Sequence, residues 1–424
     1  MLLIKSGTRC LALITLAAVT AAGAAEAPRP WPANPFLPVT EERIAALPAA
    51  EQPAWRNYWA ISQSWASFLP ARDLVDHSAT APLPGPPLGA SYSKGVRLDA
   101  PAAWYATEEA RKIADHVVNW QTIVGFWTKN GDYSRDRRPE DDHHDAWSAG
   151  TFDNDSTIYE MRFLALVNAA APAEADTPRT DAWRMSFLQG AIHLLQAQYP
   201  NGGFPQIYPL VGWYHDAITF NDDAMVHILE LLRDIAGRQA EFAFVPPQLS
   251  GLAQKRLERG IQCVLATQIR APDGTRTVWG QQHDALTLQP CAARNFEPIS
   301  ECSRESAGLV QFLMTVPHPS PEIIAAVDGT MQWFPRRALH NVSWDRNAPA
   351  GTDLQSSPGA PDLWSRFYEF GTGKPIYSER DRMIHYTPAE LSFERRKGYA
   401  WFNTRGTELL PLYAEWKKSL AVAK

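Results

Sequence analysis

Long helical segments dominate the chain from about residue 105 onward, because apolar side chains recur there at i, i+3 and i+4. Three segments share one layout, a helix followed by a glycine-containing turn: ARKIADHVVNWQTIVGFWTKN, MSFLQGAIHLLQAQYPNGGFPQIYP and LERGIQCVLATQIRAPDGTRTVWGQQHD. A second helix is expected between them, in STIYEMRFLALVNAA, DDAMVHILELLRDIAG and ESAGLVQFLMTV, and IIAAVDGTMQWFP is a shorter fourth copy of the first helix. The chain has no run of alternating β-branched residues, so no strand is predicted.

The repeat is about seventy residues long, which indicates stacked supersecondary units. Pairs of helices that repeat without strands favour antiparallel hairpins set in an arc or ring. We therefore predict an all-α fold, an incomplete (α/α) toroid built from repeated antiparallel helical hairpins. In such a ring, the loops at one end of the hairpins converge on a single cleft.

The turns after the first helices also resemble one another. Each helix terminates near a glutamine, namely Gln121, Gln198 and Gln268. An aromatic residue then follows at the same position of each turn: Trp127, Phe204 and Trp279. Three equivalent aromatic side chains are expected to pack between stacked units rather than to serve as platforms for a ligand.

The N-terminal hundred residues differ in character from the rest. Residues 1–25 are expected to be a secretory signal peptide, with Lys5 and Arg9 ahead of a short apolar core and small residues after it. Residues 26–100 form a helical and Pro-rich segment with a linker at 77–95, and residues 101–424 form the toroid domain. We expect a secreted or periplasmic protein that is a monomer and has no membrane anchor.

The composition is that of a globular protein, with 45% hydrophobic and 20% charged residues. The formal net charge of −6 argues against a nucleic-acid partner. A polyanionic ligand would need local cations. Beyond residue 25 the cysteines are Cys263, Cys291 and Cys302. An oxidising compartment permits a Cys291–Cys302 disulfide, and three buried thiols are the alternative.

Two polar stretches, TFDNDS at 151–156 and TFNDDA at 219–224, stand at equivalent places before second helices, where CSRESA at 302–307 also aligns. Asp and Asn are preferred N-caps of helices. They are also hard oxygen ligands of the kind that calcium requires. The stretches can therefore close helices, supply oxygen atoms to a shared cleft, or do both.

An ordered set of segments between about 105 and 405 resembles the family 10 polysaccharide lyases, which are pectate lyases. The set is GFWTKN, TFDNDSTIYEMRFLA, YPNGGFPQIYPL, YHDAITFNDDAMVHILELLRD, VWGQQHDALTLQPCAARNFEP, RESAGLVQFLM, LWSRFYEFGTGKPIYSERD and RRKGYAWF. The resemblance implies a secreted, calcium-dependent lyase that cleaves de-esterified polygalacturonate by β-elimination.

The resemblance also assigns roles to single residues. It implies that Arg294 in CAARNFEP is the catalytic base and that Arg380 in YSERD contacts substrate. Ca²⁺ and the substrate uronate are expected at Asp153 and Asp222. Further candidates are Asp223 and Asp216 for the metal, and Asn154, Lys129 and Arg304 for the substrate. The chain departs from the family pattern at Thr128, where proline is expected, and near Arg304, where small residues are expected.

The residues themselves leave two questions open. Arginine normally stays protonated, so Arg294 is either the base or a bidentate clamp for a uronate carboxylate. The fold and the paired aspartates also suit a toroid glycoside hydrolase that uses Asp153 and Asp222 as acid and base. A terpene-cyclase-like toroid and a non-catalytic pectin-binding protein are further alternatives. Calcium dependence separates the lyase from the hydrolase.

Overall fold

The computed structural model describes residues 27–31, 37–69, 93–141, 147, 149–171 and 177–422. The expected signal peptide, residues 1–25, lies outside the described residues, as does most of the expected linker at 77–95. No described helix is both long enough and apolar enough to cross a membrane.

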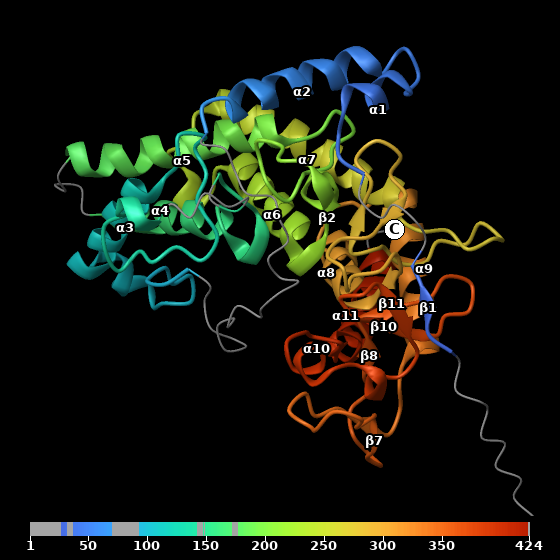
Figure 1. Cartoon of the computed structure of the whole chain (residues 1–424). Helices are drawn as coiled ribbons and strands as arrows, with labels where there is room; N and C mark the ends of the chain where they lie inside the picture. The colour runs from blue at the N-terminus through green and yellow to red at the C-terminus, as the bar shows by residue number, and fades with distance from the viewer. Residues whose placement is uncertain are drawn as a thin grey trace, which may run out of the picture.

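Helices make up the layer that carries the repeat (Figure 1). Its members are α3 (Glu108–Trp120), α4 (Ile158–Ala170), α5 (Thr177–Ala197), α6 (Ala224–Gly237), α7 (Pro247–Thr267), α8 (Ser303–Met314), α9 (Pro321–Arg337) and α11 (Arg405–Val422). Consecutive helices pack in pairs, α4 with α5, α6 with α7 and α8 with α9, as the repeat predicts. Their buried faces form one continuous hydrophobic core.

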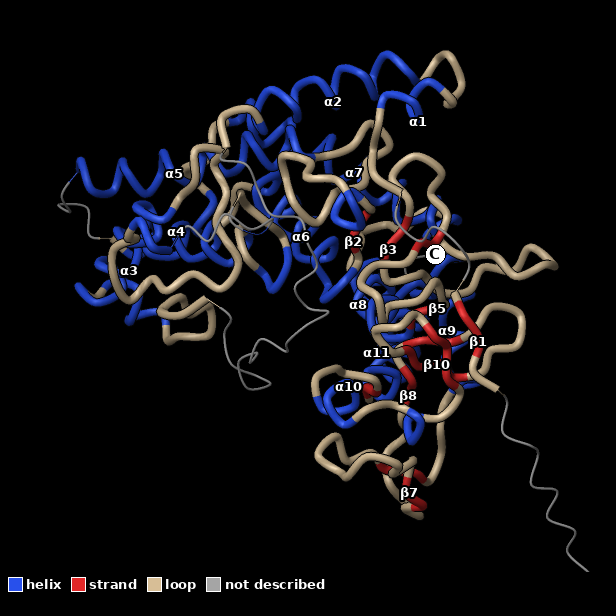
Figure 2. The backbone as a smooth tube through the Cα atoms, viewed as in Figure 1, coloured by secondary structure: helices blue, strands red, loops and turns tan. Residues whose placement is uncertain are grey.

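The prediction of an all-α fold, an incomplete (α/α) toroid, is wrong, because the structure is a mixture of helices and short sheets (Figure 2). A five-stranded sheet has the order β1 (Arg29–Pro30), β11 (Met383–His385), β10 (Pro375–Ser378), β9 (Phe367–Tyr368) and β5 (Glu301–Cys302). A three-stranded sheet joins β2 (Ile218–Thr219), β3 (Gln282–His283) and β4 (Pro290–Cys291). Two-stranded sheets join β12 (Phe402–Asn403) to β8 (Trp364–Ser365) and β6 (Val342–Ser343) to β7 (Gln355–Ser356). Most of these strands span two residues, which is too short for an alternating pattern to be visible in the sequence.

The repeated glutamines join neighbouring units. Each donates one hydrogen bond to a carbonyl of its own turn and another to a carbonyl of the next unit's helix, with distances of 2.8 to 2.9 Å. The acceptors of the second set are Ser186 on α5, Arg256 on α7 and Ala326 on α9. Trp127, Phe204 and Trp279 are fully buried in the hydrophobic core, so they are not exposed as platforms for a ligand.

The N-terminal segment is attached to the helical layer. Helix α2 (Gln52–Ala66) lies across the outside of α5 and α7 (Figure 1). The rings of Trp55 and Tyr58 contact Tyr199 there, with centroid distances of 5.1 and 4.9 Å. Ahead of it, α1 (Glu41–Ala45) carries Arg43, which forms an ion pair of 2.6 Å with Asp284.

Cys263, Cys291 and Cys302 are buried free thiols, which is the second of the two alternatives. Cys291 and Cys302 form no disulfide. Cys302 instead donates from Sγ to Oε2 of Glu305 at 2.5 Å. Burial raises the pKa of Cys263 to about 12, so this thiol stays protonated and unreactive.

Candidate active site

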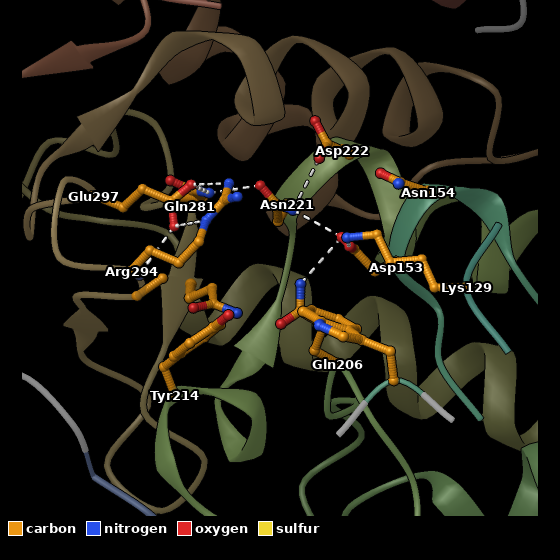
Figure 3. Close-up of a pocket in the computed structure, with 13 residues that line it drawn as sticks. Lys129, Asp153, Asn154, Gln206, Tyr214, Asn221, Asp222, Gln281, Arg294 and Glu297 are labelled. Atoms are coloured by element: carbon orange, nitrogen blue, oxygen red, sulfur yellow. Dashed lines mark hydrogen bonds and ion pairs between the residues drawn. The ribbon is translucent and has the colours of Figure 1, made fainter. Parts of the chain in front are cut away.

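A polar pocket lies where the repeat loops meet the three-stranded sheet (Figure 3). Arg294 and Glu297 stand on one side and Lys129, Asp153 and Asn154 on the other. Asn221 lies between the two sides. The full lining is Lys129, Trp147, Asp153, Asn154, Gln206, Tyr214, Asn221, Asp222, Gln281, Gln282, Ala293, Arg294 and Glu297.

The two polar stretches turn into this pocket instead of capping helices. They form the 3-10 turns η5 (Asp153–Asp155) and η7 (Asn221–Asp223), and no side chain in either turn makes a cap hydrogen bond to the following helix. The second and third residues of each turn have left-handed backbone, with φ between 49° and 64°. Asn and Asp adopt this conformation at the least cost among residues other than glycine. The repeated Asp and Asn therefore serve a backbone turn that points oxygen atoms inward.

The amide of Asn221 links the two pocket carboxylates. Its Nδ2 donates to Oδ1 of Asp153 at 3.1 Å and to Oδ2 of Asp222 at 2.9 Å. Lys129 forms an ion pair with the other oxygen of Asp153. The guanidinium groups of Arg304 and Arg366 lie 3.3 and 3.6 Å from Oδ1 of Asp222. Burial alone would raise the pKa of Asp222, but these two arginines hold it below its usual value, so the carboxylate is ionised.

A buried pair of neutral groups supports Asp153 from below. Gln206 donates from Nε2 to Oδ1 of Asp153 at 3.1 Å, and its Oε1 lies 3.0 Å from Nδ1 of His215. Burial lowers the pKa of His215 to about 3, so the imidazole is neutral at ordinary pH. A neutral His215 that donates from Nδ1 fixes the orientation of the Gln206 amide.

The pocket offers hard oxygen donors but no closed metal cage. Among the described residues, no three His, Cys, Asp or Glu side chains are grouped to hold an ion. Asp153 and Asp222 supply two carboxylates, and the amide of Asn154 lines the same pocket. Calcium takes six to eight oxygen ligands and tolerates irregular geometry. The residues present therefore fit calcium only as part of a shell that substrate and water complete.

Asp223 and Asp216 lie outside the pocket and have other partners. Asp223 forms an ion pair with Arg405 of α11, with contacts of 2.8 and 2.5 Å. Asp216 accepts from the backbone nitrogens of Val39 at 3.0 Å and Gly212 at 2.8 Å. Both carboxylates hold chain segments together, so neither is part of the calcium site proposed below.

Arg294 is held by Glu297 in the loop between β4 and β5. Its Nε and Nη2 donate to the carboxylate of Glu297 at 3.0 and 2.6 Å. Burial alone would lower the pKa of Arg294, but the charge of Glu297 raises it well above the usual value. Arg294 is therefore a protonated guanidinium in the free protein, and its surroundings do not favour the neutral form.

The other expected cations stand around the same site. Arg380 is bound to Glu394 at 3.0 Å and lies over the ring of Phe296, which it shares with Arg294. It is not among the residues that line the pocket. The sequence analysis missed Arg366, a buried arginine that pairs with Glu305 and reaches Asn221 at 2.9 Å.

Several neutral lining residues were also missed. They are Asn221, Gln206, Gln281, Gln282, Tyr214 and Trp147. Asn221 was within the quoted stretch TFNDDA and is the counterpart of Asp153 in the repeat, so alignment of the units could have found it. Gln206 and Gln281 lie two residues after the repeated aromatics Phe204 and Trp279, as Lys129 does after Trp127, so this spacing could have found them.

Comparisons with known proteins agree with the resemblance seen in the sequence. The family model described as pectic acid lyase matches residues 121–410. A variant of the family 10 polysaccharide lyase from Cellvibrio cellulosa, solved in complex with trigalacturonic acid, is 32% identical and covers 74% of this chain and 95% of that chain, with a TM-score of 0.65. A second structure of the family 10 lyase from the same organism is 32% identical and covers 77% of this chain and 99% of that chain, with a TM-score of 0.64. No curated protein matches the chain.

The family match extends over more than half of the chain and includes each of the loops that line the pocket. The chain therefore belongs to the pectic acid lyase family and is a family 10 polysaccharide lyase, a pectate lyase.

Proposed function

We propose that this pectate lyase cleaves polygalacturonate by calcium-assisted β-elimination, with Arg294 as the base. The observation that carries the proposal is that Arg294 lines the same pocket as the carboxylates of Asp153 and Asp222. A base and a pair of metal-binding carboxylates are the two parts that the reaction needs. The complex of the Cellvibrio cellulosa relative with trigalacturonic acid supports an oligogalacturonate as the ligand.

Asp153 and Asp222 would hold the calcium ion, and Asn154 lines the same pocket. A bound Ca²⁺ would neutralise the uronate carboxylate and so acidify the proton on the adjacent carbon. Lys129, Arg304 and Arg366 already balance the two carboxylates in the free protein. Incoming substrate carboxylates can take over these cations, which leaves the aspartate oxygens free for the ion.

Substrate binding falls to the cations around the pocket. Lys129, Arg304 and Arg380 are proposed to hold successive uronate carboxylates, and Asn154 to contact the sugar. Each of the three has a partly exposed side chain that is paired with a carboxylate of the protein. Such a local set of cations lets a protein of net charge −6 bind a polyanion.

A hydrolase mechanism fits this pocket less well. An inverting or retaining hydrolase needs one carboxyl group that is protonated, to act as general acid. Asp222 has a lowered pKa because of Arg366 and Arg304, and Asp153 is paired with Lys129. Neither carboxylate is therefore suited to donate a proton.

The biological setting is also a proposal. We propose that residues 1–25 direct export, that the protein acts in the periplasm or the medium, and that it works as a monomer. Residues 101–424 are proposed as the catalytic part and residues 26–100 as its N-terminal support, since Val39 and Arg43 bind Asp216 and Asp284 near the pocket loops.

One assay tests the reaction. The full chain is incubated with polygalacturonate and calcium at alkaline pH, and the ultraviolet absorbance of unsaturated uronates is followed. We expect the absorbance to rise with calcium and to stop rising when a chelator is added. New reducing ends without this absorbance would indicate hydrolysis and overturn the proposal.

A further inference from the structure

The contacts of Glu297 occupy one edge of the Arg294 guanidinium and leave the edge at Nη1 available. Oε2 of Glu297 accepts from the backbone nitrogen and from Nε of Arg294, both at 3.0 Å, and Oε1 accepts from Nη2 at 2.6 Å. Among the described residues, Nη1 of Arg294 has no acceptor. The side chain of Arg294 is 31% exposed, whereas that of Glu297 is 2% exposed. The unbound edge therefore belongs to the pocket and the bound edge to the protein interior.

Glu297 is itself fixed from several directions. Its Oε1 also accepts from Nε2 of Gln281 at 3.0 Å and from the hydroxyl of Tyr399 at 2.8 Å. Its backbone nitrogen donates to the carbonyl of Arg294 at 2.8 Å, which closes the turn. Nε2 of Gln281 also donates to Oδ1 of Asn221 at 2.5 Å, and Nδ2 of Asn221 donates to both pocket carboxylates. One chain of hydrogen bonds thus connects the arginine to Asp153 and Asp222.

We infer that Glu297 is a positioning residue that presents Nη1 of Arg294 as the atom that takes the proton; this inference rests on the function proposed above. A neutral guanidine that lacks a proton at Nη1 still carries N–H groups at Nε and Nη2. It can therefore keep both hydrogen bonds to Glu297. The tautomer without a proton at Nε would lose one of them, and a tautomer with a single proton on Nη2 keeps its bond only when that proton points to Glu297. Glu297 therefore excludes Nε as the base and directs the lone pair away from itself.

The proton transfer is balanced without a further reactant. The proton on the carbon next to the uronate carboxylate moves to Nη1, and the C–H electron pair becomes the new carbon–carbon double bond. The bond between the β carbon and the leaving oxygen breaks. The oxygen keeps the electron pair of this C–O bond and takes a proton from water. The guanidinium so formed is stabilised by Glu297 and returns its proton to solvent.

The same contact has a cost, because an adjacent carboxylate disfavours the neutral guanidine. Glu297 raises the pKa of Arg294, and the charge and hydrogen bonds of Arg294 in turn lower that of Glu297 despite its burial. The charged and titratable groups that face Arg294 are Glu297, Tyr399, Tyr214, Asp222, His215 and Arg395. Glu297 is the carboxylate in direct contact with Arg294, so its removal should shift the pH at which the rate rises.

The test is the pH dependence of kcat and KM of Glu297→Gln beside the parent protein. We expect kcat to fall roughly 10²-fold or more, as when a carboxylate that fixes a base's tautomer is removed. We expect KM to stay within about threefold and the alkaline rise to move about one pH unit or more toward neutrality. A matched control is Glu394→Gln, which removes the paired carboxylate of Arg380. It should change KM and leave the position of the alkaline rise unchanged.

Two further variants make the result decisive. If Glu297→Gln does not fold, Glu297→Asp keeps the charge but shortens the reach, so kcat should fall about tenfold with the alkaline rise in place. Parental kcat in either variant would overturn the inference. So would a Glu297→Gln variant that loses rate while its alkaline rise stays at the parental pH. Arg294→Ala distinguishes a failure of the inference about Glu297 from a failure of the proposal that Arg294 is the base. If it is inactive, the base proposal stands whatever Glu297 does, and if it keeps the parental rate, the base proposal itself fails.

Discussion

Nδ2 of Asn221 lies 3.1 Å from Oδ1 of Asp153, the residue at the equivalent position of the preceding repeat unit. The same nitrogen also binds Asp222, so one neutral amide links two carboxylates in the protein without a bound metal ion. This contact turns a pair of repeated loops into one site.

Asn221→Ala should weaken calcium binding. Without the amide, the two carboxylates repel each other and lose their common orientation. Groups that orient metal ligands typically contribute 10- to 100-fold to affinity, so we expect the calcium concentration for half-maximal rate to rise by about that factor. The measurement is the initial rate against free calcium. An unchanged calcium dependence would show that the carboxylates are positioned by other contacts.

Asp222→Asn should separate a metal-binding aspartate from a structural one. We expect this variant to lose most activity at low calcium and to recover part of it at high calcium. The matched control is Asp223→Asn, one residue away, which breaks the ion pair with Arg405. That control should lose about 1–3 kcal/mol of stability and keep the calcium dependence of the parent. Equal effects of both variants on calcium dependence would contradict the assignment.

Glu160 should make stability depend on pH. It is fully buried beneath Ser93, and burial raises its pKa from 4.5 to about 6. The folded protein then holds a proton that the unfolded chain has released, so the contribution of Glu160 to stability is complete below pH 4.5 and declines as pH rises toward 6. Between pH 4.5 and 6, Glu160→Gln should reduce the loss in the free energy of unfolding by about 2 kcal/mol, as measured by denaturant unfolding. The slope that remains is expected from Asp216, whose pKa burial also raises to about 6.

Gln198→Ala should destabilise the junction between repeat units. The side chain donates to the carbonyls of Gly202 and Arg256 at 2.9 and 2.8 Å. Truncation would leave both carbonyls without this donor, at a cost of about 1–3 kcal/mol for each. Chemical denaturation measures the loss, and a variant as stable as the parent would show that water replaces the amide.

The helical part of this fold could be predicted from the sequence because each helix of the repeat extends over at least three turns, long enough for its apolar positions to recur visibly. The strands could not. Ile218–Thr219 and Gln282–His283 form a sheet through loops brought together by the helices, and two residues carry no period. The all-α prediction failed at these contacts between segments far apart in the sequence.

The candidate site shows the same division. Asp153, Asp222, Arg294 and Lys129 were expected from the motifs, and all four line one pocket. The groups that connect them were not expected, because the position of Gln281 two residues after a repeated aromatic does not show which partners it meets in the folded chain. Arg366 was missed for a similar reason, since its partners Glu305 and Asn221 become neighbours only in the folded chain.

The central claim, that Arg294 takes the proton, is tested most directly by comparing kcat and KM of Arg294→Ala with those of the parent at alkaline pH and saturating calcium. As the base, Arg294 should contribute about 10²- to 10⁴-fold to kcat, with KM for polygalacturonate changed by only a few fold. A variant that keeps its kcat and loses only KM would show that Arg294 is a carboxylate clamp, and the account would be contradicted.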